Sequence, residues 1–171
     1  MLFSFASCGG ETKVSTEIGE GVFSSFVSTD MNVAVVTQKI FENHKVTMIN
    51  LWGTFCSPCI SEMPDLAELN KEYADQGFQV IGIPVDIVDQ NLIKIDDKVK
   101  DARDIISSTG ADYTHIVPSE TLNEAYLNDA QTVPETVFVN SEGKIIGSSY
   151  MGAKSKAEWE NIIKILLESV E

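Results

Sequence analysis

Two short and almost uninterrupted apolar runs stand out in the first half of the chain, at Val46–Trp52 and Phe78–Val85. Runs of this length and composition are typical of strands that are buried on both faces of a sheet. Between them, apolar residues recur at helical spacing from just after Cys56 to about Gln76, and Gly77 is a suitable helix C-cap. A strand, a helix and a second buried strand together predict a right-handed βαβ unit with parallel strands.

The second half of the chain predicts a helix, a strand and a short helix, followed by a β-hairpin and a final helix. The hairpin turn is expected at Asn140–Lys144, where Gly143 suits the positive φ angle that such a turn needs. Ser155 and Glu158 have the spacing of a capping box at the start of the last helix. The expected elements are a helix over 98–108, a strand over 113–117, a short helix over 120–127, a strand opened by Pro134, a return strand over 145–150, and a last helix with the apolar stripe Trp159, Ile162, Ile163, Leu166 and Leu167.

The first 21 residues differ in character from the rest of the chain, because small and polar residues follow one another there without periodicity. Such a segment is typical of a tether. We therefore expect an N-terminal tether over 1–21 and one folded domain over 22–171. The domain is expected to open with two short strands, at 22–27 and 32–36, that flank a turn at 28–30.

Composition narrows the class of protein. The chain has 171 residues, of which 43% are apolar, and this is enough to build the core of one domain. Its 26 acidic residues outnumber its 12 Lys and Arg and give a net charge of −14. This charge argues against nucleic acid as a partner, because phosphate binding needs clustered positive charge, and it favours solubility instead. No apolar run approaches the length of a transmembrane helix.

The candidate chemistry lies between the first buried strand and the helix after it, where Cys56 and Cys59 are separated by two residues. A C-x-x-C at a strand-to-helix junction is typical of a thioredoxin-like redox site. The first turn of a helix has unpaired N–H groups and partial positive charge, which stabilise a thiolate. Cys56 is therefore the expected nucleophile and Cys59 the resolving thiol. Pro58 suits the first helical turn, where a missing N–H costs nothing.

A zinc site is the structural alternative for these cysteines. Zinc needs four ligands, and the further candidates are Cys8, His44 and His115, which are scattered along the sequence. We expect His44 to lie at the surface and His115 to be a packed or edge residue of a strand. The ligand count therefore favours redox chemistry over metal binding.

Residues Asn50–Pro64 resemble the active-site segment of the thioredoxin superfamily, most closely that of its TlpA- or ResA-like branch of extracytoplasmic thiol-disulfide oxidoreductases. Members of this branch carry the pattern N-F-W-x-x-W-C-x-P-C-x-x-E-x-P, and this chain reads N-L-W-G-T-F-C-S-P-C-I-S-E-M-P. Phe55 replaces the second tryptophan, which bears on recognition and redox potential rather than on the chemistry. The resemblance implies an α/β, thioredoxin-like fold with a central mixed sheet flanked by helices and an extra helix–strand insertion.

The same resemblance implies a substrate-binding surface beside the two cysteines. The Val133–Pro134 bond is expected to be cis and to face them, with the backbone of Val133 pairing with an extended substrate segment. Trp52, Phe55 and Pro58 are expected to contribute to this surface. On the residues alone, an ordinary trans proline at the start of a strand is the favoured interpretation of Pro134.

The resemblance further implies a carboxylate near the thiols. Many thioredoxins have an aspartate six residues before the first cysteine, but this chain has Asn50 there, which cannot titrate. Glu62, three residues after Cys59, resembles the carboxylate that ResA-like proteins place near their thiols. Its implied role is proton shuttling and tuning of the thiol pKa. From the residues alone, a solvated glutamate favoured by the helix dipole stays an open alternative.

The function implied by the resemblance is reduction of protein disulfides outside the cytoplasmic membrane, with no cofactor beyond the redox-active Cys56–Cys59 disulfide. Apocytochrome c is a candidate substrate, and a membrane thiol reductant carrier is the implied electron donor. Residues around Cys8 resemble the end of a bacterial lipoprotein signal, which would place a lipid anchor on Cys8. The direction of electron flow depends on the redox potential and the partner, and the sequence does not determine it.

Two other functions stay open at this stage. A peroxidase of the peroxiredoxin type needs a Thr-x-x-Cys site and an activating arginine. Here Thr54 is two residues before Cys56, and the only arginine, Arg103, lies far away in the insertion. A copper-binding thioredoxin-like carrier would use the soft thiolates of Cys56 and Cys59 together with a histidine.

Overall fold

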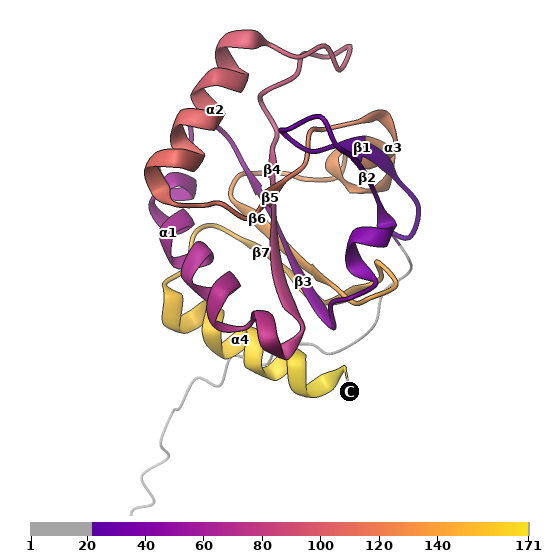
Figure 1. Cartoon of the computed structure of the whole chain (residues 1–171), viewed down its shortest axis with the longest axis vertical. Coiled ribbons are helices and arrows are strands. Elements are labelled where there is room, and N and C mark those ends of the chain that lie inside the picture. Colours follow the sequence, from indigo (N-terminus) through magenta and orange to yellow (C-terminus); the bar gives the residue numbers. More distant parts are fainter. Residues whose placement is uncertain (1–21, 171) are drawn as a thin grey trace, which may run out of the picture.

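A five-stranded sheet with the strand order β5-β4-β3-β6-β7 forms the centre of the structure (Figure 1). The computed structural model describes residues 22–170. β3 and β4 are parallel and are joined by a helix, as the two apolar runs predict; β5 adds a further parallel strand, whereas β6 and β7 are antiparallel. The mixed sheet confirms the expected thioredoxin-like fold class. The strand bounds are β3 Val46–Trp52, β4 Phe78–Pro84, β5 Thr114–His115, β6 Glu135–Val139 and β7 Ile145–Met151.

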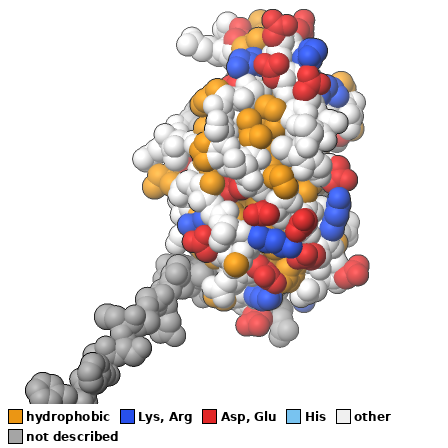
Figure 2. All heavy atoms as spheres, turned by 90° about the vertical axis from the view of Figure 1, so that its left-hand side faces the viewer, with side chains coloured by type: hydrophobic (Ala, Val, Ile, Leu, Met, Phe, Trp, Pro, Cys, Tyr) orange, Lys and Arg blue, Asp and Glu red, His pale blue; other side chains and the backbone are white. Residues whose placement is uncertain are grey.

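Three helices cover one face of this sheet: α1 (Ser57–Glu72), α2 (Asp96–Thr109) and α4 (Lys156–Ser169) (Figure 1). α1 is followed by a 3₁₀ turn and by Gly77 in the left-handed conformation, so the predicted C-cap is confirmed. The capping box that starts α4 is also present. Figure 2 shows this side of the molecule, where acidic and basic side chains are interspersed rather than gathered by sign.

The opposite face of the sheet is covered by smaller elements. They are the two-stranded sheet of β1 (Val27–Thr29) and β2 (Val35–Thr37), a 3₁₀ helix at Gln38–Phe41, and α3 (Glu120–Leu122), which continues as a π-helical segment at Asn123–Leu127.

The two layers have separate cores because successive side chains of a strand point to opposite faces. In β3, Met48 and Trp52 belong to the core under the three helices, whereas Ile49 and Leu51 belong to the other core. Asn50 therefore lies on the helix-covered face, beneath the start of α1.

The first hairpin differs from its expected position. The turn lies at 30–34 rather than at 28–30, and β1 includes Ser28. The reason is the side chain of Asp30, whose Oδ1 accepts the backbone N–H groups of Asn32 and Ala34 at 2.8 Å each. Ser28 is buried and donates to the carbonyl of Val117, so it belongs to the sheet rather than to a turn.

The insertion also differs in its limits. β5 contains only residues 114–115 of the strand expected over 113–117, and α2 begins at Asp96 rather than at Lys98. The expected tether over 1–21, including Cys8, lies outside the described residues. Within 22–170, none of the helices has the length and apolar content needed to cross a membrane.

Candidate active site

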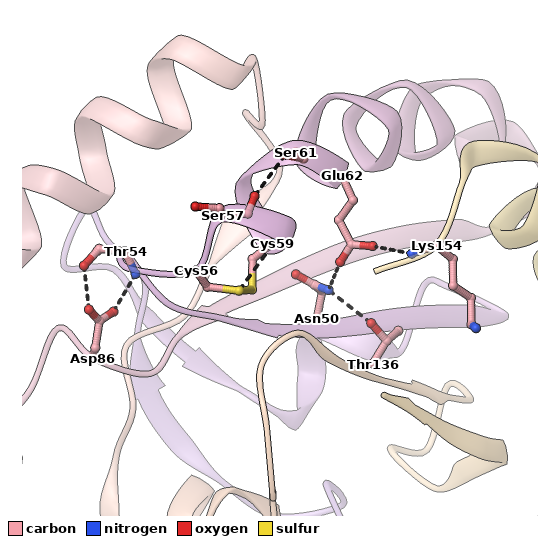
Figure 3. Close-up of a disulfide and its surroundings, with 10 residues drawn as sticks. All are labelled: Asn50, Thr54, Cys56, Ser57, Cys59, Ser61, Glu62, Asp86, Thr136 and Lys154. Atoms are coloured by element: carbon pink, nitrogen blue, oxygen red, sulfur yellow. Dashed lines mark hydrogen bonds between the residues drawn. A yellow bond between two sulfur atoms is a disulfide. The ribbon is translucent and has the colours of Figure 1, made fainter. Parts of the chain in front are cut away.

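The two cysteines lie where β3 ends and α1 begins, and they form a disulfide with a Cα–Cα distance of 5.3 Å (Figure 3). Cys56 is the N-cap residue of α1, and its Sγ accepts the backbone N–H of Cys59 at 3.3 Å. Pro58 occupies the first turn of the helix. The local sequence thus folds as predicted. The central strand β3 ends at Trp52, the chain turns at Gly53, and Cys56 lies at the unpaired N–H groups of the helix that follows.

The environments of the two sulfur-bearing residues differ. Cys56 keeps 5% of its surface exposed, whereas Cys59 has none. After reduction, the N-terminus of α1 would stabilise a thiolate on Cys56. A thiolate on Cys59 would lack contact with water and would depend on nearby donors, because burial disfavours charge. The arrangement therefore provides one accessible nucleophile and one sheltered thiol.

The loop before Cys56 is held by residues that the sequence patterns did not single out. Asp86 accepts the backbone N–H of Thr54 at 2.9 Å and its hydroxyl at 2.5 Å, and Lys98 of α2 donates to the Thr54 hydroxyl at 2.9 Å. Lys98 also forms an ion pair with Asp86 at 3.3 Å. Because Trp52 and Pro84 are paired across β3 and β4, residues two positions further on meet at the same edge. This parallel register is the signal that could have identified Thr54 and Asp86.

Glu62, in the second turn of α1, is 3% exposed, so it is not a solvated surface residue. Its Oε1 accepts from Asn50 Nδ2, and its Oε2 accepts from the backbone N–H of Lys154 and from Trp159 Nε1, each at 3.1 Å. Burial raises the pKa of Glu62, and these hydrogen bonds oppose the increase. The carboxyl group is thus a buried, hydrogen-bonded acid whose pKa lies above its ordinary value.

Asn50 connects Glu62 to the neighbouring strand. Its Nδ2 donates to Glu62 Oε1 and to Thr136 Oγ1, both at 3.1 Å (Figure 3). Thr136 lies directly opposite Asn50 in the antiparallel pairing of β3 and β6. Sequence reasoning singled out Glu62 but missed Thr136, Lys154 and Trp159, because their contacts depend on that pairing and on the position of α4.

The expected substrate-binding residues do not all lie at the surface. The Val133–Pro134 bond is cis, as expected, and it immediately precedes β6. Phe55 is 67% exposed beside Cys56 and Pro58 is also exposed, whereas Val133 is half-buried. Trp52 is completely buried, and its Nε1 donates to His115 Nδ1 at 3.2 Å. This corrects its assignment as a substrate-binding residue: its ring packs beneath the site, out of reach of a substrate at the surface.

The histidines and the arginine are engaged in other contacts. His115 is buried, its Nε2 bonds the carbonyl of Ala111 at 2.9 Å, and burial lowers its pKa to about 4. His44 is half-buried and precedes the N-terminal end of β3, whereas the cysteines follow its C-terminal end. At a rise of about 3.3 Å per residue, the two ends of this strand are roughly 20 Å apart. Arg103 donates to the carbonyl of Met31. Among residues 22–170, no group of three or more His, Cys, Asp or Glu side chains is arranged to hold a metal ion.

Comparison with known proteins agrees with this geometry. Thiol-disulfide oxidoreductase ResA of Bacillus thuringiensis subsp. konkukian (strain 97-27) is 27% identical over 156 residues, covering 86% of this chain and 78% of the relative. The crystal structure of a thiol:disulfide interchange protein of the thioredoxin family from Chlorobium tepidum TLS superposes with a TM-score of 0.68 at 20% identity, covering 92% of this chain and 99% of that one. StoA from Bacillus subtilis gives a TM-score of 0.62 at 14% identity and covers 84% of this chain and 98% of that one. Residues 20–163 match the Redoxin family, and the chain therefore belongs to that family as a TlpA/ResA-like thiol-disulfide oxidoreductase of the thioredoxin superfamily.

Proposed function

We propose that this oxidoreductase works as a reductase of protein disulfides, with Cys56 as the nucleophile and Cys59 as the resolving thiol. The observation that carries the roles of the two cysteines is their unequal exposure at the start of α1, and the reductase direction rests on the resemblance to ResA-like proteins. In the reduced protein, the Cys56 thiolate attacks a substrate disulfide, one substrate sulfur leaves as a thiolate and takes up a proton, and a mixed disulfide remains. Cys59 then attacks Cys56, and the second substrate sulfur leaves in the same way.

Glu62 is the proposed proton acceptor for Cys59 in the second step. A general base works best when its pKa lies near the operating pH, and burial moves the pKa of this carboxyl group upward in that direction. Its position on the turn of α1 after Cys59, with its carboxylate beside Asn50, supports the assignment (Figure 3).

The exposed side chains of Phe55 and Pro58 are the proposed apolar contact for the substrate next to Cys56. The backbone of Val133, before the cis peptide bond, is the proposed partner of an extended substrate segment. Apocytochrome c is the proposed substrate and a membrane thiol carrier the proposed electron donor. The substrate, the electron donor and an extracytoplasmic location are proposed because the sequence resembles TlpA/ResA-like proteins. A lipid anchor on Cys8 is proposed because the residues around it resemble a lipoprotein signal.

The reduction potential of the Cys56–Cys59 pair tests the proposed direction, and it is measured by equilibration with glutathione or dithiothreitol buffers. A value of about −270 mV or lower supports a reductase, because that is the range of thioredoxin. A value near −120 mV, typical of a strong oxidant, would make the protein a disulfide donor and overturn the proposal. A Cys8→Ser variant is the matched control, because it removes the third thiol without changing the pair.

A further inference from the structure

Asn50 has an oxygen atom that takes no part in the two thiol-exchange steps. The residue is completely buried, and its Oδ1 has no hydrogen-bond partner among the described residues. Both hydrogens of Nδ2 are directed to Glu62 and Thr136, so the planar amide turns its oxygen away from them. Figure 3 shows this oxygen on the side of the Cys59 sulfur. A disulfide sulfur has no hydrogen to donate, but a Cys59 thiol formed by reduction has one.

The orientation of the amide depends on the proton of Glu62. Oε2 already accepts two N–H groups, from Lys154 and Trp159, so a proton on Glu62 belongs on Oε1, the atom that faces Asn50. An ionised Glu62 needs the NH₂ end of Asn50, whereas a protonated Glu62 needs its oxygen end. The hydroxyl of Thr136 can either accept or donate, so it satisfies both orientations.

The end of the amide that lies on the side of the Cys59 sulfur would therefore differ between the two protonation states of Glu62. With Glu62 ionised, the amide oxygen lies on the side of Cys59 (Figure 3), where it would be available to accept from the thiol of the reduced protein. With Glu62 protonated, the NH₂ group faces Cys59 and donates to its thiolate. A hydrogen bond to the charged form favours that form, so each orientation stabilises one consistent pair of protonation states.

We propose that Asn50 is a positioning residue that couples the protonation of Cys59 to that of Glu62, by turning its amide through half a turn as the proton moves from Cys59 Sγ to Glu62 Oε1. Asn50 does not itself carry the proton. An aspartate at this position could accept the proton directly. The asparagine instead stabilises the state before the transfer, with a Cys59 thiol, and the state after it, with a Cys59 thiolate.

This coupling serves the resolving step, and it rests on the proposed role of Glu62 as the proton acceptor. The Cys59 thiolate, stabilised by the NH₂ group of Asn50, forms a sulfur–sulfur bond with Cys56. The bond between Cys56 and the substrate sulfur breaks, and its electron pair leaves with that sulfur, which takes a proton from solvent. Glu62 then releases its proton to solvent, and the amide returns to the orientation of the oxidised structure.

Within residues 22–170, two other titratable groups, Lys154 and Tyr113, interact with Glu62 and affect its titration. Lys154, in the loop before α4, lowers the pKa of Glu62 through its charge as well as its backbone N–H. Tyr113, just before β5, has a pKa that burial raises, and the nearby charge of Glu62 raises it further. Neither residue is hydrogen-bonded to Glu62 Oε1, whereas Asn50 is. A proton on Oε1 therefore changes the hydrogen bond to Asn50 directly.

A double-mutant cycle tests the coupling, with the pKa of Cys59 read from its ¹³Cβ chemical shift in fully reduced protein. In Glu62→Gln, the side-chain oxygen of the new glutamine must accept from Lys154 and Trp159, so the glutamine NH₂ group faces Asn50. This NH₂ group needs an acceptor, so it holds the Asn50 oxygen toward itself and the Asn50 NH₂ group toward Cys59. We expect the pKa of Cys59 to fall by about one unit. In an Asn50→Leu background, most of that decrease should disappear. A decrease of equal size in both backgrounds would overturn the proposal, because Glu62 would then act through its charge alone.

A second measurement keeps the test decisive if Asn50→Leu does not fold. In the Glu62→Gln protein, nuclear Overhauser contacts are expected between the Asn50 amide protons and the Cys59 β-protons. These contacts should be weak in reduced wild-type protein with ionised Glu62, and equal contacts in both proteins would overturn the proposal. Glu68→Gln removes an exposed charge from the same helix and is the matched control, with no expected change at Cys59. None of these measurements depends on substrate reduction, so failure of the coupling and failure of the proposed reductase activity are distinguishable.

Discussion

Replacing Trp159 with phenylalanine would test the environment of Glu62 most directly. The indole is completely buried, and its Nε1 donates to Glu62 Oε2 at 3.1 Å. A hydrogen bond to a charged group contributes about 1.5–3 kcal/mol, compared with about 0.5–1.5 kcal/mol for one between neutral groups. Trp159→Phe should therefore destabilise the protein by about 1 kcal/mol more when Glu62 is ionised than when it is protonated. It should also raise the pKa of Glu62 further.

The pH dependence follows from the sign of the shift. The pKa of Glu62 in the folded protein lies above its ordinary value of 4.5, so this residue binds more protons folded than unfolded between those two values. Its contribution to stability therefore decreases as pH rises through the folded pKa. In Trp159→Phe the decrease extends to higher pH, so the difference in free energy of unfolding between variant and wild type should grow with pH.

Urea unfolding at pH 5 and pH 8, together with a ¹³C titration of the Glu62 carboxyl group, would measure both effects. Trp52→Phe is the matched control, because Trp52 is equally buried and also donates through Nε1, but to His115. His115 has a pKa of about 4 and is uncharged in the folded protein at both pH values. The loss of ring volume should cost the same at either pH. An unchanged Glu62 pKa in Trp159→Phe, or a loss of stability independent of pH, would refute the reasoning.

Three further predictions concern other parts of the site. Asp86→Ala removes both contacts to Thr54, and we expect it to lower the free energy of unfolding by about 1–3 kcal/mol and to speed hydrogen exchange of the Thr54 amide; unchanged exchange would contradict this role. Cys59→Ser should accumulate a mixed disulfide between Cys56 and a model substrate, visible by mass spectrometry, whereas Cys56→Ser should not. For His115, burial depresses the pKa from 6.5 to about 4, so the protein should lose about 3 kcal/mol of stability as pH falls through this range; a His115→Gln variant should lose measurably less in urea unfolding at pH 7 and pH 4.

The active-site segment shows how far local sequence can be interpreted. The apolar run Val46–Trp52 predicts β3 with its observed bounds, because continuous burial on both faces requires continuous apolar character. The position of Cys56 at the helix N-terminus and the capping box of α4 depend only on neighbouring residues. These features were predictable because the interactions that form them span four residues or fewer.

Other properties of the site depend on contacts between distant parts of the chain. Spacing along α1 does not reveal that Glu62 is buried, since its partners Lys154 and Trp159 lie 92 and 97 residues further on. Trp52 matches the sequence pattern of the substrate-binding segment, yet alternation along β3 directs it into the core against His115. The amino-acid sequence by itself determined which strand and helix carry the cysteines. Tertiary structure decided which side chains lose contact with water, and through burial and hydrogen bonding it decided their protonation.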